Sequence, residues 1–369
     1  MDPLRQAEAR TYNRARRRLG LVSSLVSLAA LVAIAAAAGQ IGGWWTLVLL
    51  GPGLWLLELP TGYAGYHLSK RHGLSRQNTR GWAVDRLKGG LVGAVLGGLA
   101  VVAVIACQRQ WPDGWVLAAW LAAVAFTALL AVIWPILLLP IFLRSEPLRD
   151  GRLAAEMWRT AEAAGVRVRE IRLLRMGEKT AAANAMVAGL GPTLRIYVGD
   201  TLAEAKDEAE EQALARTRVV LAHELGHHVH RDVWRLLAVS AVVSAAGMAG
   251  AYLAVRAFAP DGPGHLTALP ALALGYAAGS LIVSPLAAAY SRRRERAADR
   301  YAVALTGEGE TFARAIERLV RQNLAELWPP RLRHLLTASH PASGERIAAA
   351  RGTPPTRQEL DWLSGTSRR

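Results

Sequence analysis

The segment "LAHELGHHVH", residues 221–230, decides how the rest of the chain is interpreted. It holds four of the chain's nine histidines and one carboxylate, Glu224. His223, Glu224 and His227 form the pattern H-E-x-x-H. On a helix, positions i and i+4 lie one above the other, so two imidazoles there can bind one Zn²⁺ ion. A glutamate beside the first ligand can take a proton from water at the metal. The pattern therefore predicts half of a hydrolytic zinc site.

The remaining two histidines of the segment leave an alternative ligand pair. His230 is seven residues after His223 and returns to nearly the same helix face, so it can also pair with His227 at i, i+3. Only the pair His223 and His227 places Glu224 beside the first ligand. We therefore favour that pair and expect His228, which is rotated away, and His230 to be bystanders.

Composition indicates a membrane protein. Of the 369 residues, 52% are hydrophobic, and they are concentrated in long apolar runs. Each crossing of a bilayer by a helix uses about 20 apolar residues. Six runs are candidate spans, namely 19–39, 44–60, 89–107, 114–143, 234–258 and 267–290. Cys107 is the only cysteine, which excludes an internal disulfide and a cysteine-based zinc site.

The basic residues predict the orientation in the membrane. The net charge is +15, and arginines and lysines gather in the N-terminal arm, the loop 61–88, the start of the segment after 143 and "SRRRER" at 291–296. Such clustering follows the rule that cytoplasmic loops are positive, so we expect no nucleic-acid partner. Six spans place both termini and the polar stretch 144–233 on the cytoplasmic side. Arginine-rich usage points to a bacterial cytoplasmic membrane.

The polar stretch reads as a small α/β unit. Helical spacing predicts a helix at 151–165, and alternation predicts a strand at 166–176. Residues 184–202 read as strand, turn and strand, and 209–232 as a helix. The predicted fold is a mainly α membrane protein with about six spans and a small β-sheet around a gluzincin-like zinc helix. We expect an N-terminal membrane region at 1–145, a metallopeptidase domain at 146–350 and a loosely ordered polar tail at 351–369.

The third metal ligand is expected after the sixth span. "SRRRERAADRYA", residues 291–302, offers Glu295 and Asp299 on one helical face. Glu295 would complete a His₂Glu site, and Asp299 would accept a hydrogen bond from a ligand histidine. The alternative is that both acids only pair with the neighbouring arginines. The topology favours the metal site, because the sixth span returns this segment to the side of 221–230.

These residues resemble a known family. "HELGH" and "SRRRERAAD" are similar to motifs of the integral-membrane zinc metallopeptidases typified by CAAX prenyl protease 1 and the heat-shock protease HtpX. "NAMVAGLGPTLRIYVGDTL" at 184–202 resembles the family's strand pair. "ELPTGYAGYHLSKRHGLSRQNTRGWAVDRLKG" at 58–89, together with 139–153, resembles the prenyl-protease branch, and "SHPASGERI" at 339–347 also fits the family.

The resemblance implies roles for particular residues. His223, His227 and Glu295 would bind one zinc ion per chain, with Glu224 as base and then acid and Asp299 supporting a ligand. Asn184 and Ala185 would bind the substrate through pairing of an extended peptide with the strand at Asn184, and Arg346 would bind it near the metal, where the family has a histidine and an arginine that His340 and Arg346 match. His340 would stabilise the oxyanion of the tetrahedral intermediate; otherwise it is a plain loop residue before Pro341.

Three functions are compatible with the sequence, and two of them use the predicted zinc site for peptide hydrolysis. One is a prenyl-protease-like endopeptidase acting on hydrophobic, C-terminal or lipid-modified peptides in contact with membrane lipids. Another is quality control of damaged membrane proteins. A non-catalytic membrane scaffold is the alternative from another class. The six predicted spans, where the prenyl protease has seven, and Ala182 and Ala183, where eukaryotic enzymes are polar, leave the substrate open.

Overall fold

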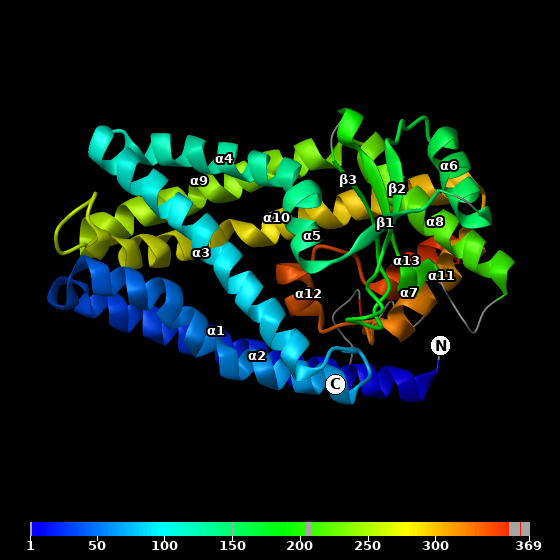
Figure 1. Ribbon diagram of the computed structural model, residues 1–369, viewed down its shortest axis with the longest axis horizontal. Coiled ribbons are helices and arrows are strands. Elements are labelled where there is room, and N and C mark those ends of the chain that lie inside the picture. The colour runs from blue at the N-terminus through cyan, green and yellow to red at the C-terminus, as the bar shows by residue number, and fades with distance from the viewer. Residues whose placement is uncertain (1, 150, 190, 204–208, 354–361, 363–369) are drawn as a thin grey trace.

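A computed structural model of the 369-residue chain describes residues 2–149, 151–189, 191–203, 209–353 and 362. Long apolar helices extend to one side, and a mixed helix and sheet portion lies at the other (Figure 1). Helix α10 runs through both. The predicted fold class is confirmed: the chain is mostly helical, with long apolar helices and one small sheet.

The apolar helices lie on five continuous helical segments of the described chain that are long and apolar enough to cross a membrane. The first, Pro3–Arg71, contains two helices joined by a π-helical turn, Leu49–Gly53, at Pro52. The six helices are α1 (Pro3–Val48), α2 (Leu54–Arg71), α3 (Thr79–Gln110), α4 (Trp115–Ile133), α9 (Asp232–Phe258) and α10 (Leu269–Thr306). A second π-helical turn, η2 (Trp134–Leu138), at Pro135, and α5 (Leu139–Phe142) prolong α4.

The first segment folds back on itself at Gly42. Gly42 has a φ of 77°, which interrupts the helix. Hydrogen bonds then join Ser27 to Glu58 and Thr61 to Ser23. The chain therefore forms an antiparallel hairpin, visible in Figure 1, whereas the sequence predicted six separate spans and the described chain has five candidate membrane segments.

One expectation about this region is wrong. Residues 61–88 are not a loop, because α2 continues to Arg71 and α3 already starts at Thr79. The polar ends of both helices stay helical since their aromatic side chains pack together. Tyr66 stacks on Trp82 at 5.6 Å between ring centroids and donates a hydrogen bond to the carbonyl of Gln77. Only the short segment 72–78 connects the two helices.

Helices α9 and α10 form a second hairpin with direct backbone contact. A Cβ placed on Gly275 would lie 2.2 Å from the carbonyl oxygen of Gly250, and one on Gly279 would lie 2.1 Å from that of Ala246. Only glycine allows so close an approach, and small residues at helix interfaces are typical of membrane bundles. This crossing fixes the course of α10, which carries Glu295 and Asp299 beyond its apolar part.

The sheet packs against two helices to form the core of the polar portion. The strands are β1 (Ser145–Pro147), β2 (Glu170–Leu174), β3 (Ala185–Ala188) and β4 (Arg195–Gly199), in the order β1-β2-β4-β3. Strand β4 is parallel to β2 and antiparallel to β3. Ile171, Ile196 and Val198 pack with Leu221 and Leu225 of α8 (Glu210–Val229) and with α6 (Arg152–Ala163). The predicted strands and helices of this unit are present, while β1 was not predicted.

Shorter helices complete the polar portion. They are α7 (Asp200–Ala203), α11 (Gly309–Gln322), α12 (Arg331–Thr337) and α13 (Ser343–Arg351), with the 3₁₀ turns η3 (Gly191–Thr193) and η4 (Leu266–Ala268). The predicted tail at 351–369 lies largely outside the described residues. Trp362, which is described, is buried and donates a hydrogen bond to the carbonyl of Pro329.

Candidate metal centre

The site forms where α8 crosses α10. The crossing point is at Gly226 and Ala298, since a Cβ on Gly226 would lie 3.2 Å from the Cα of Ala298. Gly226 lies between the two histidines of the H-E-x-x-H pattern, and Ala298 lies between Glu295 and Asp299. Small residues at both positions let the two backbones approach, which explains why glycine and alanine stand inside the two motifs.

Three potential ligand atoms converge at this crossing. Nε2 of His223 lies 3.5 Å from Oε2 of Glu295, and Nε2 of His227 lies 3.4 Å from Oε1 of the same carboxylate. One atom from each of the three side chains falls within a group no wider than 4.8 Å. Glu295 is 6% exposed and His223 7% exposed, so the cluster is largely shielded from solvent.

The residues present fit a zinc ion. Ligand atoms at about 2.1 Å from one tetrahedral ion are about 3.4 Å apart, which matches the two histidine–carboxylate distances. Oε2 of Glu295 is buried and makes no hydrogen bond of normal geometry within the described chain, although Nδ1 of His340 lies 2.8 Å from it, so this oxygen is available to a cation. Two imidazole nitrogens and one carboxylate are the donor set of hydrolytic zinc sites, which leaves one position open for water.

The Nδ1 atom of each histidine lies against a carboxylate, and each carboxylate accepts hydrogen bonds from an arginine. Nδ1 of His223 lies 2.8 Å from Oδ1 of Asp299. Arg346 contacts both oxygens of Asp299, at 2.8 and 2.6 Å. A proton on Nδ1 leaves Nε2 free to bind a metal, and a carboxylate at this position favours that tautomer. Arg346 thus contacts Asp299, whereas the sequence predicted a role in substrate binding.

The equivalent support for His227 was missed from the sequence. Nδ1 of His227 is hydrogen-bonded to Oδ2 of Asp232 at 2.9 Å, and Arg294 donates to Oδ1 of Asp232 at 2.6 Å. Asp232 is 1% exposed. It reaches back because Arg231 adopts a left-handed conformation with φ 55°, which ends α8 and starts α9 at Asp232. The sequence predicts an uninterrupted helix through residue 232. That prediction is wrong, and it does not reveal the contact between Asp232 and His227.

Glu224 is half-buried beside the cluster, next to His223 on α8. Burial raises the pKa of the Glu224 carboxyl, while the neighbouring histidines oppose that rise. Burial also lowers the pKa of His223, but its contacts with Asp299 and Glu295 outweigh burial and raise the pKa to about 9. A carboxylate with a raised pKa is suited to take up a proton near neutral pH.

His340 reaches the same cluster from the segment after α12. Its Nδ1 lies 2.8 Å from Oε2 of Glu295, and its side chain is largely exposed. Arg292 fixes this segment by donating to the carbonyl oxygens of Ala338, at 2.7 Å, and of His334, at 3.3 Å. Arg292, the first arginine of "SRRRER", therefore positions the residues that precede His340. The sequence did not reveal this role.

Strand β3 forms one edge of the sheet and faces α8. It pairs with β4 on one side only among the described strands. Asn184, just before β3, is exposed, whereas the side chain of Ala185 packs into the core. Ala185 can therefore contact a ligand through its backbone only. The remaining histidines of the opening segment lie outside the three-residue ligand cluster: His230 packs edge-on against Tyr301, and His228 lines a cleft that His227 also borders.

The site combines two histidines on one helix, a glutamate beside the first of them, and a carboxylate as the third potential ligand. Such a site joined to long apolar helices defines a membrane metallopeptidase. Comparison with known families agrees. Residues 147–354 match peptidase family M48, and residues 2–144 match the N-terminal region of CAAX prenyl proteases, described as five membrane helices. The chain belongs to peptidase family M48 and is a metalloprotease of the CAAX prenyl protease type.

Individual relatives support this membership. The chain is 30% identical over 316 residues to the uncharacterized metalloprotease YhfN of Bacillus subtilis, covering 83% of this chain and 73% of that protein. It is 26% identical to a CAAX prenyl protease 1 homolog of Arabidopsis thaliana, covering 79% and 68%. The crystal structure of S. mikatae Ste24p matches with a TM-score of 0.78 at 21% identity, covering 95% of this chain and 89% of that one. That match shows a shared fold.

Proposed function

We propose that the protein is a zinc endopeptidase that cleaves hydrophobic, C-terminal or lipid-modified peptides at the cytoplasmic face of a bacterial cytoplasmic membrane. The observation that carries the proposal is the convergence of His223, His227 and Glu295 within 4.8 Å, beside Glu224. One zinc ion bound there would polarise the peptide carbonyl and lower the pKa of a water molecule.

The side chains of the protein would do the rest of the chemistry. Glu224 takes the proton of the attacking water and delivers it to the leaving amine. His340, exposed and close to Glu295, would donate a hydrogen bond to the developing oxyanion. Asp299 and Asp232 keep the ligand histidines in the tautomer that binds metal.

The free edge of β3 supports binding of an extended peptide. Backbone groups of a substrate can pair with this edge, with the exposed Asn184 at its start. The surface of α12, near His340, supports an apolar substrate, since Leu332 is 73% exposed and Leu335 and Leu336 are exposed as well. An apolar chain held against these leucines would be shielded from water.

The charges and the turns between the apolar helices support an orientation in the membrane. The short loops near 40–43, 108–114 and 259–266 gather at the end far from the metal centre (Figure 1). Arg109 donates to the carbonyl of Gly264 there, which joins two of them. The basic segments lie toward the metal centre, so we infer that this end is cytoplasmic.

The decisive experiment compares the wild type with Glu224→Gln. Purified wild type is expected to hold about one zinc ion and to cleave members of a peptide library. Glu224→Gln should keep the zinc and lose about 10²–10⁴-fold in kcat/KM, the usual contribution of a general base. Glu211→Gln, an exposed position on the same helix, is the matched control. Equal cleavage by both variants would exclude the enzyme mechanism.

A further inference from the structure

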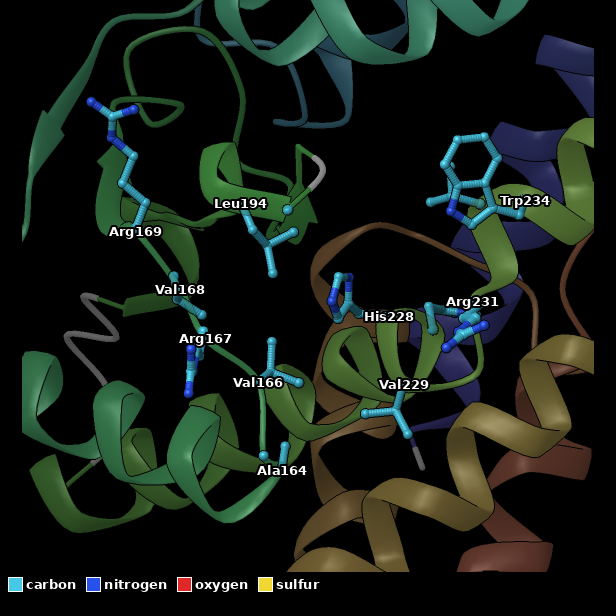
Figure 2. A pocket seen from close by; sticks show the side chains of 14 residues that line it. Ala164, Val166, Arg167, Val168, Arg169, Leu194, His228, Val229, Arg231 and Trp234 are labelled. Atoms are coloured by element: carbon cyan, nitrogen blue, oxygen red, sulfur yellow. The ribbon is translucent and has the colours of Figure 1, made fainter.

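Beside His227 the surface is hollowed into a cleft of about 980 Å³ that the mechanism above does not use. Its walls are the segment 164–169 that leads into β2, Gly191 and Leu194 near the β3–β4 turn, and six residues at the end of α8 and the start of α9, namely His227, His228, Val229, Arg231, Val233 and Trp234 (Figure 2). The volume lies at the upper end of the range of ligand clefts, enough for several peptide residues.

The cleft continues from the region that we assign to peptide binding. His227, a metal ligand, is part of its wall. On the opposite wall, Gly191 follows the end of β3 at Ala188 by three residues. A peptide paired with β3 and lying across the metal centre would therefore enter the cleft with residues distant from the scissile bond.

The charges of the cleft are of one sign. Arg167, Arg169 and Arg231 line it, together with His228, and its described lining contains no carboxylate. All three arginines are exposed, and none forms an ion pair with another described residue. Elsewhere on the sheet arginines are paired, as Arg172 is with Glu170 at 2.7 Å. Three unpaired guanidinium groups around one hollow favour an anionic ligand.

The walls between these charges are apolar. Figure 2 shows Val166 and Leu194 on the strand side and Trp234 on the helix side, with Arg231 next to Trp234. In this view Arg167 and Arg169 lie on the strand side of the cleft, and the guanidinium group of Arg169 is directed away from Trp234. Exposed arginine side chains change rotamer within nanoseconds, so they can turn onto a ligand without movement of the backbone.

We propose that this cleft binds a carboxylate of the peptide substrate, away from the scissile bond. The inference rests on the proposed peptidase function and extends it by naming a charge preference. The carboxylate can come from an acidic side chain or from the C-terminus of the peptide, because guanidinium groups bind both in the same bidentate way. A peptide is favoured over a lipid headgroup because a metal ligand, His227, forms part of the same wall.

The test uses zinc-loaded full-length protein in neutral detergent and three fluorogenic peptides with a common core. The first carries glutamate at a scanned outer position and an amidated C-terminus. In the second, glutamine replaces the glutamate. The third has the glutamine and a free C-terminus. We expect a carboxylate to raise kcat/KM about threefold to tenfold through KM, and we expect 0.5 M NaCl to remove most of the gain. Comparing the first and third peptides identifies the source of the carboxylate.

Substitutions in the cleft locate the effect. Arg231→Gln, and the double change Arg167→Gln with Arg169→Gln, should each reduce the carboxylate preference toward one. Arg235→Gln is the control, because Arg235 is exposed four residues further along α9 but does not line the cleft. Equal loss in Arg235→Gln would mean that general surface charge, not the cleft, causes the preference, and would overturn the proposal.

Two further measurements keep the cleft separate from catalysis and from lipid. Binding of the same peptides to Glu224→Gln protein, followed by fluorescence anisotropy, reports on the cleft even if no peptide is cleaved. Equal affinity of the glutamate and glutamine peptides, and of the free and amidated ones, overturns the inference, whereas absent cleavage alone contradicts only the peptidase function. If the arginine variants instead lose binding of anionic phosphatidylglycerol and keep their peptide preference, the occupant is lipid and the proposal is wrong.

Discussion

Asp232→Asn is the sharpest test of how the metal centre is built. In the wild type both oxygens of Asp232 accept hydrogen bonds, one involving Nδ1 of His227 at 2.9 Å and one from Arg294 at 2.6 Å. Asparagine keeps the shape but has only one acceptor oxygen. One of the two donors must therefore face an NH₂ group. Because the residue is 1% exposed, no solvent can replace the lost partner.

The expected effect is a loss of metal affinity. Removing the residue that orients a ligand histidine typically weakens metal binding about 10-fold to 100-fold, or about 1.4–2.8 kcal/mol. Zinc affinity is measured on the full chain in detergent by competition with a fluorescent chelator. Peptide cleavage at saturating zinc should recover much of the wild-type rate, because the ligands and Glu224 remain. Asp113→Asn, at an exposed loop position, should leave the affinity unchanged.

A second variant separates orientation of the histidine from simple disruption of the fold. Arg294→Gln removes the partner of Asp232 but leaves the hydrogen bond to His227, so its effect on zinc affinity should be smaller. Thermal unfolding of both variants checks that the protein is intact. An unchanged zinc affinity in Asp232→Asn, or a larger loss in Arg294→Gln, would refute the reasoning.

Three other predictions follow from the geometry. Gly226→Val should force α8 away from α10, lower zinc affinity and cut peptide cleavage, as measured by chelator competition and turnover. Gly279→Ala should lower the midpoint of thermal unfolding by several degrees, since its Cβ would lie 2.1 Å from a backbone oxygen of α9, whereas Gly97→Ala, with open space around it, should not. His223 must lose its proton to bind metal, and its pKa is raised to about 9, so apparent zinc affinity should fall as the pH decreases below 9, which equilibrium dialysis at several pH values would show.

The convergence of residues that depends on local spacing could be predicted from the sequence. His223 and His227 share a face because helical periodicity places i and i+4 together, and Glu295 follows from the need for a third ligand on the same side of the membrane. The structure brings all three together. The strands and helices of the polar unit were also predictable, because each carries its own pattern of apolar residues.

Contacts made through a change of chain direction could not be predicted in the same way. Asp232 contacts His227 only because Arg231 turns the chain out of α8, and nothing in the alternation of apolar and polar residues marks a left-handed arginine. Arg346 was placed at the substrate, but it lies behind Asp299, since its partner depends on how α13 packs against α10. The limits of α2 and α3 were misjudged because aromatic packing keeps their polar ends helical.

The candidate metal centre is joined rigidly to the apolar helices through α10. Helix α10 is continuous from Leu269 to Thr306, so the apolar part that packs on α9 and the part that carries Glu295 move together. Glycine contacts at Gly275 and Gly279 fix the first part against α9, and Ala298 fixes the second against α8. Because α8 leads directly into α9, the candidate ligands on α8 and α10 are held by three helices, α8, α9 and α10, that pack on one another. A shift at the α9–α10 crossing must therefore change the separation of His227 and Glu295, which makes the packing of the spans part of the active site.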